Sequence, residues 1–135
     1  MANALYGLGR QAFLEGAIPW LTANIKVYLV DVADYTVAID THDFADDVAT
    51  VGKVATSGNL ASKTSSLGVA NAAGVTFTAV TGDPSEALII WRDTGTQSTS
   101  QLICYIDTAT GLPVTPNGGD ITITWDTGAN KIFKL

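Results

Sequence analysis

The sequence predicts a mainly β protein: an antiparallel β-sandwich or jelly roll with a short N-terminal helix. Apolar and polar residues alternate along several short segments, and turn residues, among them 13 Gly and 4 Pro, separate these segments. Helical spacing of apolar residues is clear only near the start of the chain. Eight or nine short strands with few helices are typical of sandwiches and jelly rolls. At 135 residues we expect a single β domain spanning 1–135, because one core suffices at that size.

The first expected element is a helix over residues 3–15. Asn3 is a residue type that caps helices, and Leu5, Leu8 and Phe13 fall on one face at helical spacing. Gly16 and the following proline would end the helix. Two glycines inside it lower its intrinsic stability. We therefore interpret residues 1–20 as an N-terminal helical segment that needs a packing partner, and as a candidate partner-contact arm.

The spacing then changes to alternation. Residues 25–29 and 35–39 are expected to form two strands joined by a turn, and "THDFADDVA" a helical turn capped by Asp43, with Asp46 in a capping-box position. Two short strands follow around the Ser57-Gly58 turn. Residues 75–79 and 121–125 show the cleanest alternation, which predicts one inward face of Val75, Phe77, Ala79, Ile121, Ile123 and Trp125. "KIFKL" ends the chain as a short strand.

The segment "ALIIWRDTGTQSTSQLICYIDT" (87–108) is expected to be a hairpin that is apolar on both faces of both strands. On the first strand Leu88 and Ile90 oppose Ile89 and Trp91; on the second, the alternation sets Leu102, Cys104 and Ile106 against Ile103 and Tyr105. A strand buried on both faces needs a cover on each. One cover is the facing sheet, and the other is the N-terminal helix or a neighbouring subunit. The polar tip would be a contact loop.

Composition excludes several classes of function. Charged residues make up 15%, well below the usual share of about 25%, which favours a surface partly covered by another subunit. The formal net charge is −6 and the basic residues are scattered. We therefore expect no nucleic-acid partner, and no attraction to an anionic membrane. No segment reaches the ~20 apolar residues of a membrane span, and we expect a soluble protein made in the cytoplasm.

The sequence offers little for catalysis. Cys104 lies among apolar residues and is expected to be a buried hydrophobe. His42, the single histidine, is interpreted as a surface residue near a helix start. Asp93, Asp107, Asp120 and Asp126 end strands, where turn roles are more common than paired acid catalysis. We expect no enzyme, no cofactor and no metal, while keeping Asp43, Asp46 and Asp47 as candidates for a divalent cation.

Aromatic residues offer a second kind of site. Trp91 and Trp125 occupy inward positions, where core packing is the usual role. Trp20, beside Pro19, is the better anchor for a partner's pocket. Sandwich folds also commonly bind carbohydrate, so a glycan-binding face remains an alternative.

Four segments carry a family resemblance: "IKVYLVDVADYTV", "VATSGNLASKT", "VTFTAVTGDPSEALIIWRDTG" and "STSQLICYIDTATGLPVTPNGGDITITW". Together they resemble a group of small virion-associated proteins of tailed bacteriophages, most of them known only as structural or hypothetical proteins. The aromatic-basic-Asp-Thr-Gly run followed by "LICYID" is the most specific part. Trp91 and Arg92 stand here where Tyr and Lys are more usual, which keeps the residue type.

The resemblance implies a role and assigns no catalytic residues. It implies a capsid decoration or cement protein that binds the major capsid protein as a homo-oligomer, a dimer or trimer, on the outer surface of the virion head after synthesis in the host cytoplasm. The net charge of −6 favours the outside, away from packaged DNA. The alternative is a tail or head-to-tail component, including a receptor- or glycan-binding module. Candidate interface residues are Leu5, Leu8, Phe13, Trp20, Thr94, Gln97, Phe133 and Leu135.

Overall fold

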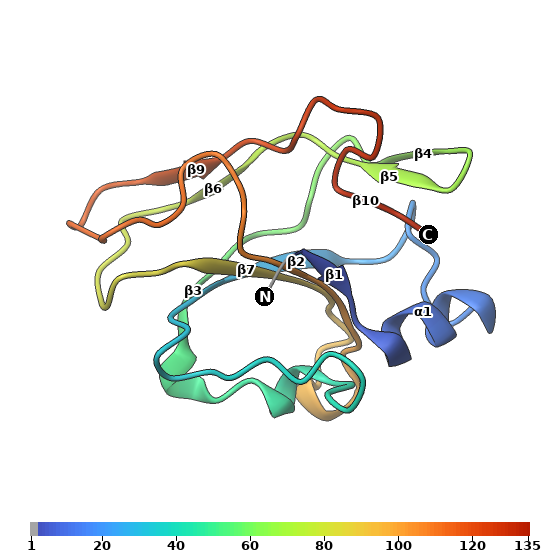
Figure 1. The fold of residues 1–135 in the computed structure, drawn as a ribbon, viewed down its shortest axis with the longest axis horizontal. Helices are drawn as coiled ribbons and strands as arrows, with labels where there is room; N and C mark the ends of the chain where they lie inside the picture. Colours follow the sequence, from blue (N-terminus) through green and yellow to red (C-terminus); the bar gives the residue numbers. More distant parts are fainter. Residues whose placement is uncertain (1–2) are drawn as a thin grey trace.

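The computed structural model describes residues 3–135 and shows three layers (Figure 1). The middle layer is a five-stranded antiparallel sheet. Its strands, in spatial order, are β1 (Ala4–Leu5), β8 (Leu102–Ile106), β7 (Ala87–Arg92), β2 (Ile25–Val30) and β3 (Lys53–Thr56). The prediction of a mainly β, antiparallel protein with one short α-helix is confirmed.

The upper layer in Figure 1 consists of two small antiparallel sheets. One pairs β6 (Val75–Phe77) with β9 (Ile121–Ile123), and the other has the order β10 (Phe133–Lys134), β5 (Val69–Asn71) and β4 (Thr64–Ser66). Apolar side chains of the middle sheet, such as Val27, Leu88 and Ile90, pack against those of the upper layer, such as Phe77 and Ile123. This is the larger of two cores.

The lower layer covers the second face of the β7–β8 hairpin. Residues 31–52 cross beneath the sheet and include two short 3₁₀ helices, η1 (Ala45–Asp47) and η2 (Thr50–Gly52). Tyr35 and Val48 from this segment form a second core with Tyr28, Ile89 and Trp91 of the sheet. The N-terminal segment, expected as one possible cover, contributes Tyr6 to this core, and residues 31–52 supply the main part of the cover.

The hairpin alternates as predicted on β7 but only in part on β8. Leu88 and Ile90 enter the upper core, while Ile89 and Trp91 enter the lower one. The register shifts between Ile90 and Trp91, which pair with Cys104 and Leu102. Ile103 is the extra residue of this bulge, so Ile103 and Cys104 both lie in the upper core while Leu102 lies in the lower one. A bulge moves every later residue to the opposite face, and simple alternation misses it.

The N-terminal helix is shorter than expected. Helix α1 spans Gly7–Leu14, and a two-residue strand, β1, precedes it. Asn3 does not cap the helix: its side-chain amide donates to the Thr108 carbonyl, and its side-chain oxygen accepts the backbone N–H groups of Asp107 and Thr108. Residues 1 and 2 of the predicted arm lie outside the described residues. Asn3 thus ties the start of the chain to the end of β8.

Two further expectations are wrong, and one strand was not expected. Residues 35–39 are not a strand; they run as irregular chain in the lower layer, where the Tyr35 ring is buried. Ala79 is exposed and has a φ of 50°, so β6 ends before it. Strand β5 was not expected, because "VAN" is too short to show alternation.

Candidate functional site

Four exposed leucines belong to segments that lie toward the right of Figure 1: α1 and the loop after it, the β4–β5 hairpin and the C-terminus. Leu14 ends α1, Leu21 lies in the loop that follows, Leu67 is at the hairpin tip and Leu135 is the last residue. Their exposed fractions are 83%, 57%, 94% and 52%. We call these four residues the leucine end. Large apolar side chains that share one exposed region indicate a contact surface.

An aromatic cluster connects the four segments that carry these leucines. The Phe133 ring lies 5.3 Å from the Trp20 ring, nearly perpendicular to it, and 5.8 Å from the Phe13 ring. The Trp20 indole N–H donates to the Thr64 carbonyl at 3.1 Å. The Leu135 N–H donates to the Gly68 carbonyl at 2.8 Å. The leucine end is therefore a fixed surface rather than four independent chain segments.

The tip of the β4–β5 hairpin has an unusual conformation. Ser66 pairs with Val69, so Leu67 and Gly68 form a two-residue turn, and their φ angles are 50° and 81°. Positive φ at both positions is the pattern of a type I′ turn, which strongly favours Asn-Gly. A leucine there is strained and is 94% exposed. The hairpin thus displays an apolar side chain at a position that neither folding nor solvation favours.

Basic residues accompany the leucines. Arg10 lies one helical turn before Leu14, and Lys134 precedes Leu135. The Lys63 ammonium, next to β4, donates to the Ala23 carbonyl at 2.6 Å, and burial lowers its pKa. Glu15 is the acid in this region. These three basic residues and one acid, Glu15, therefore lie within four residues of these leucines along the chain, in a protein whose net charge is −6.

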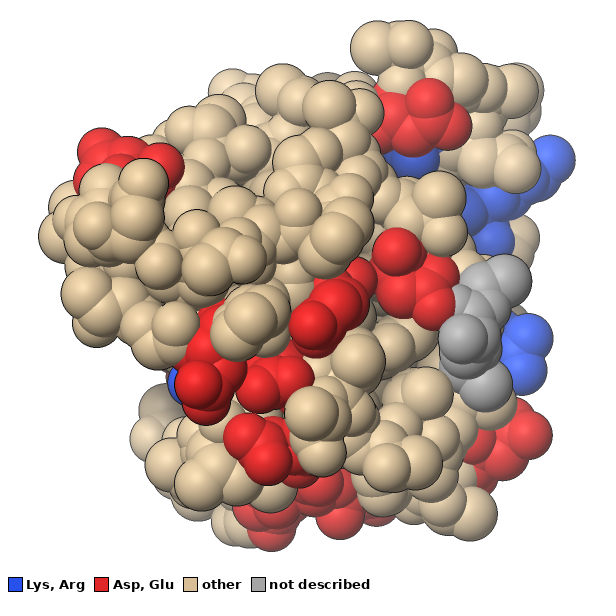
Figure 2. Space-filling model, turned by 60° about the vertical axis from the view of Figure 1, so that its left-hand side comes forward, with Lys and Arg blue, Asp and Glu red and all other residues tan. Residues whose placement is uncertain are grey.

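The opposite end of the middle sheet is acidic. Carboxylate oxygens of Asp31, Asp34 and Asp83 lie within 4.8 Å of one another. The Glu86 carboxylate, on the same side, accepts the Val32 N–H at 3.1 Å. Figure 2 turns this end forward and shows acidic side chains gathered over the lower part of the face, whereas most of the visible Lys and Arg lie along its right-hand edge. We call Asp31, Asp34, Asp83 and Glu86 the acidic end.

A hollow of about 670 Å³ lies beside the acidic end. Its walls are mixed: Val32, Val37 and the side chains of Tyr35 and Tyr105 line it together with the polar residues Thr36, Glu86, Asp107 and Thr108. Val32 is 38% exposed and the nearby Val51 is 68% exposed. Together with the four leucines, these valines make up the exposed large aliphatic side chains among the described residues.

The acidic turn whose aspartates were kept as candidates for a cation is a capping turn, as the sequence favoured. The Asp47 carboxylate accepts the backbone N–H groups of Asp43 at 2.8 Å and Phe44 at 3.4 Å. Burial raises the pKa of Asp47, but these hydrogen bonds outweigh burial and lower it overall. Burial and the Asp47 carboxylate raise the pKa of Asp43. The capping role was expected of Asp43 and Asp46; Asp47 performs it, one residue later.

Among the described residues, Asp31, Asp34 and Asp83 are the group whose spacing could hold a cation, and the sequence did not indicate them. Asp31 Oδ1 already accepts the Ala33 N–H at 2.8 Å, as in an ordinary Asx turn. His42 is half-buried, and its Nδ1 lies 2.7 Å from the Tyr35 hydroxyl. His42 therefore helps to hold the lower layer.

The strand-end acids have structural partners. Asp93 forms an ion pair with Lys26 at 2.6 Å and accepts the Gly95 N–H. Asp120 accepts the Ala79 N–H, and Asp126 accepts the Gly128 N–H. Cys104 is 2% exposed, and burial raises the pKa of its thiol to about 12. The carboxylates therefore stabilise turns and one ion pair, and the cysteine packs in the core.

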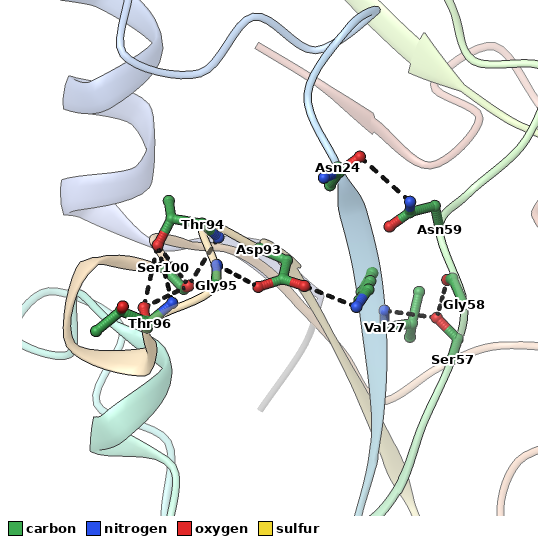
Figure 3. Close-up of polar contacts among 11 residues, drawn as sticks. Asn24, Val27, Ser57, Gly58, Asn59, Asp93, Thr94, Gly95, Thr96 and Ser100 are labelled. Carbon is green, nitrogen blue, oxygen red and sulfur yellow. Dashed lines mark hydrogen bonds and ion pairs between the residues drawn. The ribbon is translucent and has the colours of Figure 1, made fainter.

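The polar tip of the β7–β8 hairpin is bonded within itself (Figure 3). Thr94 Oγ1 lies 3.1 Å from Ser100 Oγ, and the Ser100 hydroxyl donates to the Thr96 carbonyl at 2.7 Å. The Gln97 side-chain oxygen accepts a hydrogen bond from the Lys53 ammonium at 2.7 Å. Thr94 and Gln97, both predicted interface residues, are exposed but already engaged in these contacts.

The predicted interface residues at the ends of the chain divide into two groups. Trp20 and Phe133 are each 7% exposed and support the leucine end from inside, so the prediction of Trp20 as an exposed anchor is corrected. Leu5, Leu8 and Phe13 are half-buried, and Leu135 is exposed. Sequence reasoning missed three leucines. The signal for one of them was "SSLGVAN", in which a Leu-Gly pair stands between two serines and a short apolar segment.

A cleft of about 820 Å³ opens between β1 and residues 124–134. Trp125, expected in the core, is half-buried and lines this cleft, with its indole N–H donating to the Ala73 carbonyl at 2.9 Å. The polar groups around it belong to Asn3, Thr108, Thr110, Thr124, Asp126, Asn130, Lys131 and Lys134.

The comparisons with known proteins leave the family open. No protein-family model matches the chain, and no curated protein matches its sequence. Among the described residues, no helix has the length and apolar character to cross a membrane. The resemblance to tailed-phage virion proteins therefore stays a prediction.

Proposed function

We propose that this protein is a non-enzymatic structural component of a tailed-phage virion, a decoration or cement protein that binds the major capsid lattice as a homo-oligomer. The observation that carries the proposal is the leucine end: exposed leucines from four chain segments, fixed over one aromatic cluster. Such a surface suits a protein partner, because apolar side chains gain most from burial against another protein. We further propose that the three layers form a sandwich-like domain.

The mechanism of a cement protein is mass action. A partner that binds the assembled lattice, but not its separated subunits, stabilises the lattice by RT ln(1 + [L]/Kd). Such a partner needs a domain that does not deform when it binds. The middle sheet fits this need, because the side chains of β7 and β8 are buried on both faces.

The first test is the number of copies per purified virion, measured by quantitative mass spectrometry against the major capsid protein. A number comparable with the capsid protein supports a lattice-covering role on the outer head surface. A handful of copies would place the protein in the tail or at a vertex and overturn the decoration proposal. Absence from the virion would overturn the structural role itself.

The alternative proposal is a tail or head-to-tail component with a glycan-binding site. The 820 Å³ cleft favours it, because Trp125 offers an aromatic face among hydroxyl, amide and charged groups. Glycan-array binding that a Trp125→Leu variant loses, at unchanged thermal stability, would support this alternative. Array binding that is absent, or that survives the substitution, would remove it.

A further inference from the structure

We propose that copies of this chain associate head to tail, with the leucine end of one copy on the acidic end of the next. Leu67 at the β4–β5 tip would enter the hollow lined by Val32, Tyr35, Val37 and Tyr105. The inference rests on the proposed function, whose homo-oligomer it describes by naming the two contacting surfaces. The occupant of the hollow is a second copy.

Shape is the first argument. Leu67 projects from a tight turn with 94% of its surface exposed, while the hollow of about 670 Å³ presents Val32, Val37 and two tyrosines. A single leucine side chain is much smaller than the hollow. The hollow therefore has room for the backbone of the turn at Gly68 as well, because glycine has no side chain. Burial against the two valines and the two tyrosine rings of this mixed hollow gives a reason for a leucine where the turn itself favours asparagine.

Charge is the second argument. Arg10, Lys63 and Lys134 accompany the leucines, whereas Asp31, Asp34, Asp83 and Glu86 accompany the hollow. Contact between two leucine ends would bring like charges together, and so would contact between two acidic ends. Contact between unlike ends pairs opposite charges and steers association. In a chain of net charge −6, the charge pattern thus selects one relative orientation.

The position of the two surfaces is the third argument. Strand β2 runs from Ile25, near the leucine end, to Val30, which directly precedes Asp31 of the acidic end. The two surfaces therefore lie at opposite ends of the middle sheet. Two different surfaces on one chain make a heterologous contact, which closes into a ring when the rotation per copy allows and otherwise grows into a filament. A trimeric ring is one closed form.

The test is the molar mass of the full chain in solution, by sedimentation velocity over a range of protein concentrations. Wild type is expected to exceed its monomer mass of 14.0 kDa, and to dissociate as salt rises because the charge contribution is screened. Leu67→Asp removes the apolar contact and opposes the acidic end. Association is expected to weaken about 10- to 100-fold or more. Wild type that is monomeric at every concentration overturns the inference.

Mixing two variants separates this arrangement from a symmetric one. Leu67→Asp keeps the hollow intact, and Val32→Asp keeps the leucine end intact; each alone should be monomeric. Their mixture should give a dimer and nothing larger, because one intact contact is available. A symmetric contact between leucine ends would instead leave Val32→Asp associated, and a mixture that stays monomeric would also overturn the inference.

Two further variants control for the added charge and for misfolding. Ser98→Asp adds the same charge at an exposed position outside both surfaces, and should associate as wild type does. Thr36→Asp, also exposed and lining the hollow, replaces Val32→Asp if that variant fails to fold by circular dichroism. A monomeric protein that is nevertheless present on virions in capsid-like numbers would overturn this inference and leave the proposed function standing. An oligomer that is absent from virions would overturn the proposed function and leave this inference standing.

Discussion

Trp91 shows how one side chain joins the sheet to its lower cover. Its ring stacks on Tyr28 with centroids 4.5 Å apart and planes 13° apart. It is 5% exposed, and its indole N–H has no hydrogen-bond partner among the described residues. The contribution of Trp91 to stability thus comes from packing and not from hydrogen bonding.

We predict that Trp91→Ala lowers the free energy of unfolding by about 3–5 kcal/mol, as large core truncations do. Trp91→Phe should cost much less, because it keeps an aromatic ring beside Tyr28 and removes an unpaired donor. Urea unfolding followed by circular dichroism measures both. Equal losses for the two variants would mean that the indole N–H has a partner after all.

At Leu67 we predict a substitution that stabilises the protein. Leu67→Asn should raise the free energy of unfolding by up to about 1 kcal/mol, because asparagine tolerates a positive φ better than leucine. Denaturation at a concentration where the protein is monomeric measures the change. Ser66→Asn, one residue earlier, is the matched control and should not stabilise. A less stable Leu67→Asn protein would show that leucine contributes to the fold itself.

Cys104 should be chemically silent in the native state. Burial raises the pKa of its thiol to about 12, so the reactive thiolate is scarce near neutral pH. We expect no labelling by iodoacetamide at pH 8 in buffer and rapid labelling in denaturant. Mass spectrometry distinguishes the two, and fast labelling of folded protein would contradict the burial of this residue.

At the scale of elements, helix α1 depends on its close approach to β8. A Cβ on Gly9 would lie 2.4 Å from the Leu102 carbonyl oxygen, which belongs to the backbone and cannot rotate away. Gly9→Ala should therefore destabilise the protein, although alanine favours helix by about 1 kcal/mol. Gly58→Ala is the control, since nothing lies within 4 Å of its Cβ. Thermal unfolding of both variants checks the prediction, and a stabilised Gly9→Ala would refute this packing.

The ion pair between β2 and the end of β7 predicts a dependence of stability on pH. The hydrogen bond from Lys26 and the Gly95 N–H lower the pKa of Asp93 below its ordinary value of 3.8. A lowered pKa means that Asp93 stabilises the fold fully above the ordinary value and loses this effect as pH falls through the folded value. In acid titrations, Asp93→Asn should therefore lose less stability than wild type. Parallel curves would contradict the assignment.

The sequence predicted the elements whose burial alternates. Strands β6 and β9 show that pattern because one face is buried and the other exposed, whereas β2 and β7 were recognised as strands although they are almost wholly buried. The lower cover was not predictable in this way: residues 35–39 alternate like a strand but pair with none, since their role is to lay Tyr35 against the sheet. The bulge at Ile103 also leaves no signal in the sequence, because both faces of strand β8 are apolar and a change of face does not alter the pattern.

The candidate surfaces were less predictable than the fold. Leu135 was expected at an interface, but Leu14, Leu21 and Leu67 come close only when the N-terminal segment, the β4–β5 hairpin and the C-terminus meet. The acidic end likewise joins Asp31 and Asp34 to Asp83, about fifty residues away in the chain. Periodicity describes neighbours along an element, and neither surface lies on one element.

At the scale of the whole molecule, the layers predict a gradient of stability. The strands β2, β7 and β8 lie between two cores, whereas every residue of β4 is exposed. Hydrogen exchange should be slowest for amides of β2, β7 and β8, because they open only on global unfolding, and fast in β4. Mass-spectrometric exchange checks this order. Slow exchange in β4 of the monomeric Leu67→Asp protein would contradict it.

The order of strands in the middle sheet also bears on how the chain folds. Strand β2 lies between β3 and β7, and β7 is made about sixty residues after it. While the ribosome synthesises the chain, the β7 side of β2 therefore stays an open strand edge until residues 87–92 emerge. Pairing over such sequence distance is slow, and an open apolar edge can join the same strand of a neighbouring nascent chain. We therefore expect synthesis rate and chaperone supply to limit the yield of soluble protein.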